Sequence, residues 1–260
     1  MSDLRIEQIE AVDGPIEMAV AGNAAAGRPT LVLVHGIQGT RRIWDPLIPV
    51  LALDWRVIAP NLRGRGGSFV LADPDRYGIA DFADDLAAVM DNITGNVVLV
   101  GWSMGGLVAL EYVQRYGLER IAGLILASTS ACLHAEGLEP AIWFRGKTPE
   151  ALVEEARDRA TRLKLADTAK NIAVAGAWLS AAQVDYRPVL DRIDVPALVL
   201  HGSADSECPL DHGRALAAGL TTSRLEVLTG CGHVPMAEQP DAVARSLANF
   251  AAGCEVASPS

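Results

Sequence analysis

Hydrophobic residues in this chain gather in short continuous runs that recur along most of its length. The runs cover residues 29–36, 55–60, 96–101, 121–128, 195–202 and 223–230. Runs of this length are typical of strands that are buried on both faces of a sheet. Residues 4–20 alternate weakly around Asp13 and Gly14 instead, which predicts an N-terminal hairpin.

Several of the intervening segments carry apolar residues at spacings of three and four. This spacing predicts helices over residues 79–92, 104–116 and 240–251. Buried strands that alternate with helices indicate an α/β fold, in which a mostly parallel sheet is covered by helices on both faces. The hairpin would then extend one edge of that sheet.

Residues 130–187 break the alternation, because they contain no convincing strand. Thr148 followed by Pro149 is typical of the start of a helix. An apolar stripe follows at Leu152, Ala156, Ala160 and Leu163. A second helix is expected over 166–181. We therefore expect a core made of residues 1–129 and 188–260, with 130–187 inserted as a small helical lid (cap) over one end of the sheet.

The composition narrows the choice of partners. The chain has 260 residues and a formal net charge of −10, which argues against nucleic acid or an anionic membrane as partner. No apolar run approaches the ~18 residues that span a bilayer, and no secretory signal is visible at the N-terminus. The four cysteines fit neither a metal site nor a disulfide framework. We expect a cytoplasmic protein without metal or cofactor; its oligomeric state stays open.

The segment "GWSMGG" (101–106) contains the pattern G-x-S-x-G, centred on Ser103. It follows a predicted strand and precedes a predicted helix, the context in which this pattern forms a tight turn that exposes a nucleophilic serine. Small residues on both sides let the strand and the helix approach each other. The alternative is a glycine-rich turn with an idle serine, and the rest of the chain must decide between the two.

Two further loops supply partners for such a serine. Asp205 follows the run 195–202, and His233 follows the run 223–230 among glycines. The carboxyl ends of parallel strands meet at one edge of a sheet, where ligands bind in open α/β folds. Ser103, Asp205 and His233 can therefore meet there as a catalytic triad.

The landmarks "LVLVHG", "NLRGRGGS", "GWSMGG", "DVPALVLHGSAD" and "GCGHVPMAEQP" occur in an order that resembles the α/β-hydrolase superfamily over nearly the whole chain. The likeness is to its short-lid serine esterases and lactonases. It implies that Ser103 is the nucleophile, His233 the base and Asp205 the acid. It also implies that the backbone N–H groups of Ile37 and Met104 form the oxyanion hole, with His35 shaping the first of these loops.

Alternatives remain for the acid and for the other histidines. Asp211 or Glu207 could replace Asp205 as the acid. His35 and His201 each precede a glycine at a strand end and are interpreted as hydrogen-bonded loop residues. Asn61 stands where the superfamily usually has Asp, a departure that we expect to alter only hydrogen bonds within its loop.

The expected lid is rich in aromatic and basic residues. A substrate pocket for the acyl or leaving group is predicted at Trp102, Trp143, Phe144, Trp178 and Val234, with ordinary packing as the alternative. A set of basic residues could face an anionic substrate or an acyl carrier protein: Arg145, Lys147, Arg157, Arg159, Arg162 and Lys164. The spacings Glu155–Arg159 and Asp158–Arg162 favour a solvated face with intrahelical ion pairs.

These features together predict a serine hydrolase that cleaves a small carboxylic ester or lactone through an acyl-enzyme. "GWSMGGLVAL" is similar to the same turn in pimeloyl-carrier-protein methyl ester esterases, but a local match does not transfer a substrate. Relatives with the same triad catalyse C–C bond hydrolysis, cofactor-free haloperoxidation, elimination or cyclisation. Ser103 argues against epoxide hydrolases and dehalogenases, which place Asp there. A non-catalytic binding module is the remaining alternative.

Overall fold

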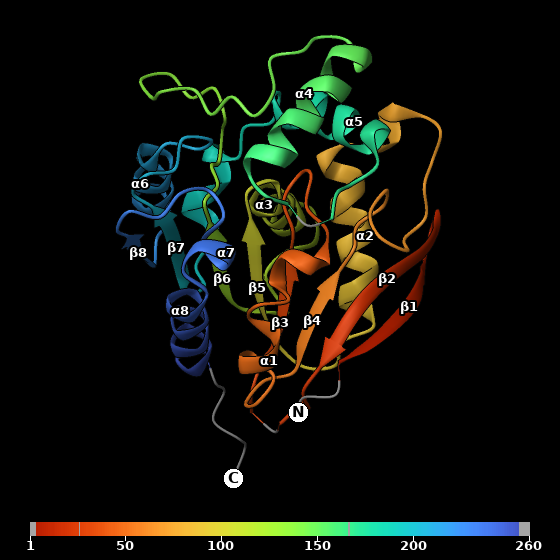
Figure 1. Ribbon diagram of the computed structural model, residues 1–260. Coiled ribbons are helices and arrows are strands. Elements are labelled where there is room, and N and C mark those ends of the chain that lie inside the picture. The colour runs from red at the N-terminus through yellow and green to blue at the C-terminus, as the bar shows by residue number, and fades with distance from the viewer. Residues whose placement is uncertain (1–3, 26, 166, 255–260) are drawn as a thin grey trace.

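The computed structural model describes residues 4–25, 27–165 and 167–254. An eight-stranded sheet runs through it in the order β1-β2-β4-β3-β5-β6-β7-β8, as Figure 1 shows. The strands are β1 Arg5–Ala11, β2 Gly14–Ala21, β3 Thr30–Val34, β4 Val57–Pro60, β5 Val97–Trp102, β6 Ile121–Ala127, β7 Ala197–Gly202 and β8 Ser223–Leu228. The hairpin β1–β2 joins β4 antiparallel, and the remaining neighbours pair in parallel. The predicted α/β fold and the predicted edge hairpin are confirmed.

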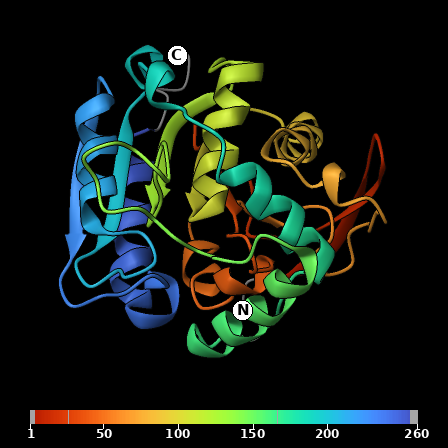
Figure 2. The same ribbon diagram turned by 90° about the horizontal axis from the view of Figure 1, so that it is seen from above.

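Helices cover both faces of the sheet (Figure 2). They are α1 Ile48–Leu51, α2 Ile79–Asp91, α3 Met104–Tyr116, α4 Pro149–Arg162, α5 Asn171–Ala181, α6 Leu210–Gly219, α7 Pro235–Glu238 and α8 Pro240–Ala252, with short 3-10 turns η1 Arg41–Trp44, η2 Pro74–Arg76 and η3 Arg187–Arg192. Alternate residues of β5 face opposite ways. Leu99 belongs to the hydrophobic cluster that contains residues of α2 and α3, whereas Val100 belongs to the cluster that contains residues of α1 and α8. This alternation explains why the strand reads as a continuous apolar run.

The 130–187 segment carries α4 and α5 above the end of the sheet toward which the parallel strands point (Figure 1). The start of α4 is as predicted, because Thr148 is the N-cap and its side chain accepts a hydrogen bond from the Ala151 N–H. The start of α5 differs, because the helix begins at Asn171 rather than near 166. The N–H groups of Ala169 and Lys170 donate instead to the carbonyls of Gln38 and Gly64. These contacts with other loops hold the chain extended before the helix.

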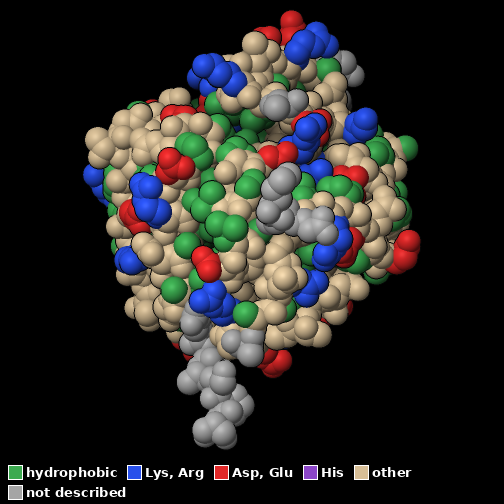
Figure 3. Space-filling model, turned by 60° about the horizontal axis from the view of Figure 1, so that its bottom comes forward, with side chains coloured by type: hydrophobic (Ala, Val, Ile, Leu, Met, Phe, Trp, Pro, Cys, Tyr) green, Lys and Arg blue, Asp and Glu red, His purple; other side chains and the backbone are tan. Residues whose placement is uncertain are grey.

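The charges on the surface and the lengths of the helices relate to the two kinds of partner that the sequence argues against, nucleic acid and an anionic membrane. On the face seen in Figure 3, acidic and basic side chains are interspersed rather than gathered in one patch of a single sign. Within the ranges given above, no helix is long and apolar enough to cross a membrane.

Candidate active site

Ser103 occupies a strained turn between β5 and α3. Its φ is 54° and its ψ is −123°, a conformation that costs a non-glycine residue free energy and is concentrated at functional sites. The flanking glycines permit the turn, because a Cβ on Gly101 would lie 2.3 Å from the Gly105 carbonyl oxygen, and a Cβ on Gly105 would lie 2.4 Å from the Val34 carbonyl oxygen. The turn therefore requires glycine at both positions.

Three side chains from separate loops form one hydrogen-bonded chain. The Nδ1 atom of His233 lies 2.9 and 3.0 Å from the two carboxylate oxygens of Asp205. Its Nε2 atom lies 3.0 Å from the Oγ of Ser103. A carboxylate only accepts hydrogen bonds, so Nδ1 carries the proton and Nε2 is free to accept the proton of the hydroxyl. This arrangement can activate a hydroxyl as a nucleophile.

The charge of Asp205 is stabilised in a buried position. Burial on its own would raise the pKa of this carboxyl. The His233 imidazole and the hydrogen bonds that the carboxylate accepts hold its pKa below the ordinary value. Two further donors are the backbone N–H groups of Glu207 and Cys208, at 3.0 and 2.9 Å from Oδ1. Asp205 is therefore ionised at neutral pH and aligned with the imidazole.

The peptide between Gly36 and Ile37 is held by the ring of His35. The Leu62 N–H donates to His35 Nε2 across 3.1 Å, so the ring proton is on Nδ1, which donates to the Gly36 carbonyl across 2.9 Å. Burial lowers the pKa of His35 to about 3, and the ring stays neutral. In a trans peptide the C=O and N–H point in opposite directions, so this bond also fixes the direction of the Ile37 N–H.

The second predicted oxyanion donor is at the start of a helix. Met104 is the first residue of α3, and the first N–H groups of a helix have no carbonyl partner within it. The helix N-terminus also favours negative charge. Ile37 follows β3 and Met104 follows β5. These two strands are paired neighbours in the sheet.

The alternative acids and histidines occupy other environments. Asp211 is exposed and pairs with Arg214 across 2.7 Å. Glu207 is buried, but its carboxylate binds Arg159 and Arg162. Two other histidines hydrogen-bond backbone carbonyls: His201 that of Cys208 and His212 that of Glu139. Within the described residues, only Asp205 contacts His233 through a carboxylate.

The predicted pocket residues divide into two groups. Trp102 lies beneath the loop after β3, where it packs against Gly36 and Gly39 and donates to the His233 carbonyl. Val234 is buried immediately after His233. Phe144 and Trp143 instead pack against Trp178, with ring centroids 5.8 and 6.0 Å apart. This aromatic cluster joins α5 to the segment that precedes α4.

The predicted solvated basic face is wrong for one residue. Arg145, Lys147, Arg157, Arg162 and Lys164 are exposed, but Arg159 is only 3% exposed. Its partners are Glu207 and Gln38, not Glu155. Glu155 accepts hydrogen bonds from the backbone N–H groups of Arg145 and Gly146, and Arg162 pairs with Glu207, not Asp158. The predicted intrahelical ion pairs do not form, because Glu207 from another loop lies close enough to bind both arginines.

The sequence contained a pattern that indicates a buried position for Arg159, but the predicted apolar stripe did not include this residue. Position 159 follows Leu152 by seven residues and Ala156 by three, which places it on the same face of α4 as both. Gln38 had no such signal, because its role depends on a helix that lies far away in the sequence.

Of the described residues, no group of three or more His, Cys, Asp or Glu side chains is placed to hold a metal ion. All four cysteines are free thiols.

Comparison with known proteins agrees with the geometry. The Alpha/beta hydrolase family matches residues 31–246 of this chain. A pimeloyl-[acyl-carrier protein] methyl ester esterase from Aromatoleum aromaticum is 30% identical over 244 residues, which cover 82% of this chain and 94% of the relative. A putative non-heme chloroperoxidase from Synechocystis is 30% identical over 86% of this chain and 91% of its own length.

A solved structure, the esterase from Exiguobacterium antarcticum, superposes with a TM-score of 0.80 at 25% identity. The superposition covers 94% of this chain and 98% of that one. The chain belongs to the alpha/beta hydrolase family. It is a hydrolytic enzyme, and relatives by sequence and by structure are named as esterases.

Proposed function

We propose that this protein is a serine hydrolase that cleaves a carboxylic ester or a lactone through an acyl-enzyme. The observation that carries the proposal is the hydrogen-bonded chain Asp205–His233–Ser103, with Ser103 held in a strained turn at the N-terminus of α3. Residues 130–187 are proposed to act as the lid, because α4 and α5 lie over this edge of the sheet (Figure 1).

In the proposed mechanism, Ser103 Oγ attacks the carbonyl carbon and passes its proton to His233 Nε2. Asp205 holds the tautomer and stabilises the imidazolium. The N–H groups of Ile37 and Met104 bind the oxyanion. His233 then protonates the leaving alkoxide as the C–O bond breaks, and afterwards activates the water that hydrolyses the acyl-enzyme. General base catalysis contributes ~10²–10⁴-fold, and each oxyanion donor a further ~10²–10³-fold.

A fluorophosphonate probe tests this proposal directly. The wild type should be labelled and Ser103→Ala should not. The alanine variant removes only the hydroxyl, so its fold is checked by circular dichroism as the control. If neither protein is labelled, Ser103 is not an activated nucleophile and the proposal fails.

Substrate class needs a second experiment. A panel of p-nitrophenyl esters and simple lactones should show hydrolysis by the wild type that Ser103→Ala lacks. If the wild type is labelled by fluorophosphonate but inactive on the panel, the same triad serves C–C bond hydrolysis, elimination or cyclisation instead.

An ester carried on an acyl carrier protein is a more specific candidate substrate. The support is the Aromatoleum relative, which is named for such a substrate and matches 82% of this chain. The test compares the hydrolysis of one methyl ester, free and attached to a carrier protein. A higher kcat/KM for the attached ester supports a carrier-protein partner, and equal values assign the enzyme to free small-molecule esters.

A further inference from the structure

One buried arginine of the lid connects two loops of the candidate site. Arg159 lies on α4, and its Nε donates to Glu207 Oε2 across 2.7 Å. Its Nη1 donates to the side-chain oxygen of Gln38 across 2.9 Å. The guanidinium also lies 5.4 Å from the centre of the Phe144 ring. A single side chain thus contacts the loop after β3 and the loop after β7, and these strands are separated in the sheet by β5 and β6.

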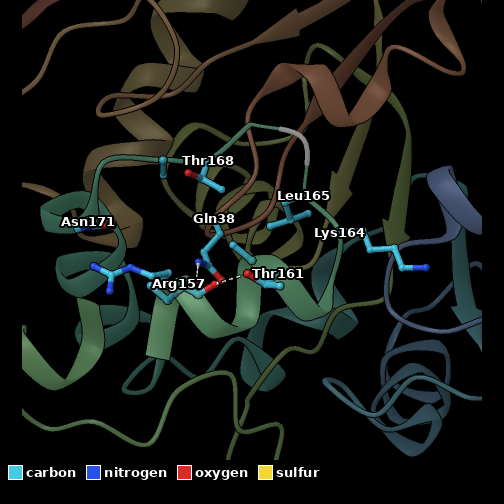
Figure 4. Close-up of a pocket in the computed structure, with 10 residues that line it drawn as sticks. Gln38, Arg157, Thr161, Lys164, Leu165, Thr168 and Asn171 are labelled. Carbon is cyan, nitrogen blue, oxygen red and sulfur yellow. Dashed lines mark hydrogen bonds between the residues drawn. The ribbon is translucent and has the colours of Figure 1, made fainter. Parts of the chain in front are cut away.

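Gln38 directly follows Ile37, and the lid holds it at three points. Besides its bond from Arg159, its amide nitrogen donates to the Ala156 carbonyl across 2.5 Å. Its own backbone carbonyl accepts from the Ala169 N–H across 2.9 Å. Figure 4 shows the Gln38 side chain directed at α4 between Arg157 and Thr161. The docked lid therefore fixes the residue next to the proposed oxyanion donor.

Glu207 makes the corresponding link to the acid. Its backbone N–H donates to Asp205 Oδ1 across 3.0 Å, while its carboxylate binds Arg159 and Arg162. Burial favours the neutral form of Glu207, but the Arg159 charge and the hydrogen bonds from Arg162 and Arg159 together outweigh burial and hold the pKa of Glu207 below its ordinary value. The side chain is therefore ionised, and its position is set by the lid.

We propose that Arg159 is a positioning residue, which aligns the oxyanion loop through Gln38 and the acid loop through Glu207 when α4 is docked. This inference rests on the proposed function of Ser103, Asp205 and His233. An arginine suits the task because its planar fork donates in two fixed directions, whereas a lysine ammonium is one point charge on a flexible stem. Removal of one partner of a buried ion pair destabilises a protein, because the other charge is left without its partner. The test therefore measures catalysis per folded molecule and measures stability separately.

The test compares Arg159→Met, Arg159→Lys and Arg157→Met on an uncharged p-nitrophenyl ester. Arg157 is exposed on the same helix and serves as the matched control. In Arg159→Met, kcat should fall ~10–100-fold, since a displacement of about 1 Å at a catalytic group costs up to ~10². KM should change less than about threefold, because ground-state binding is not the target. Arg159→Lys should recover part of the loss through Glu207, and Arg157→Met should behave as the wild type.

The fluorophosphonate labelling rate, normalised to folded protein, supplies the second readout. It should fall in parallel with kcat in Arg159→Met. Gln38→Met keeps the proposal testable if Arg159→Met does not fold, and its effect should be non-additive with that of Arg159→Lys. A lower Tm with an unchanged labelling rate would mean a merely structural role. Faster labelling would mean that Arg159 obstructs the site, and either result overturns the proposal.

Failure of the inference and failure of the proposed function are distinguishable. If the wild type is not labelled at all, the proposed function fails. If the wild type is labelled, Ser103→Ala is not, and Arg159→Met matches the wild type in kcat, only the role of Arg159 is rejected.

Discussion

The indole nitrogen of Trp102 donates a hydrogen bond to the backbone carbonyl oxygen of His233 across 2.8 Å. The centroids of the Trp102 and His233 rings lie 5.6 Å apart. Trp102 ends β5 and directly precedes Ser103, so this bond ties the strand that positions the hydroxyl to the loop that positions the imidazole. Both residues are buried, so water does not readily replace a lost donor.

Trp102→Phe should therefore lower both stability and activity. The buried carbonyl of His233 would lose its partner, which costs about 1–3 kcal/mol in the free energy of unfolding. The imidazole would be held less firmly, and kcat should fall more than KM rises. Urea unfolding and steady-state kinetics measure the two effects. A kcat equal to that of the wild type would show that this hydrogen bond does not help to position the imidazole for catalysis.

Asp205→Asn should abolish most activity while keeping the fold. The N–H groups of Glu207 and Cys208 donate to Oδ1, so the amide oxygen will take that position and the NH₂ will face His233 Nδ1. The imidazole is then forced to accept at Nδ1 and to carry its proton on Nε2, where it cannot receive the serine proton. The same substitution in a serine protease lowers kcat by ~10⁴.

Asp211→Asn is the matched control for that change. Asp211 is exposed and paired with Arg214, so kcat should stay within about twofold of the wild type, as expected for a surface ion pair. If Asp211→Asn were the inactive variant and Asp205→Asn the active one, the assignment of the acid would be reversed.

His35 should make the protein less stable as the pH falls from about 6.5. Its pKa is about 3 in the folded protein, chiefly because of burial, against ~6.5 when unfolded. Between these values the unfolded chain binds a proton that the folded chain does not. The free energy of unfolding should thus decrease by ~1.4 kcal/mol per pH unit from this residue. Burial also lowers the pKa of His201 and His212, which adds to the slope.

His35→Asn checks this contribution. The amide can still donate to the Gly36 carbonyl, but it does not titrate. Urea unfolding over a series of pH values should give a slope that is smaller by about one proton than in the wild type. Identical slopes would mean that His35 is not held neutral by the fold.

The turn at Ser103 should not tolerate a side chain at Gly105. A Cβ there would lie 2.4 Å from the backbone oxygen of Val34, so Gly105→Ala should destabilise the protein by about 1–3 kcal/mol or more. Gly253→Ala is the control, because the φ of −71° at Gly253 suits alanine. A Cβ there would lie 3.3 Å from its nearest neighbour, the backbone oxygen of Phe250. Thermal unfolding of the two variants compares them. Equal Tm values would show that the turn can relax.

The sequence by itself determined the order of the strands and of the longer helices except α6, because the spacing of apolar residues shows how often a side chain faces a core. Helix α6 (Leu210–Gly219) and the short helices α1 and α7 were not predicted. Alternating and continuous apolar runs marked the hairpin and the buried strands to within about two residues. G-x-S-x-G, with Asp205 and His233 at later strand ends, marked the residues that meet at one edge, since parallel strands bring their carboxyl ends together.

Only the tertiary structure decided how residues 130–187 contact the loops at the end of the sheet. The start of α5 at Asn171, the burial of Arg159 and the role of Gln38 all depend on contacts between residues more than a hundred positions apart. Helical periodicity reports which face of α4 is covered, but not what covers it. Glu207 lies 48 residues from Arg159 in the sequence, and it became the ion-pair partner only because the fold places the loop after β7 beneath α4.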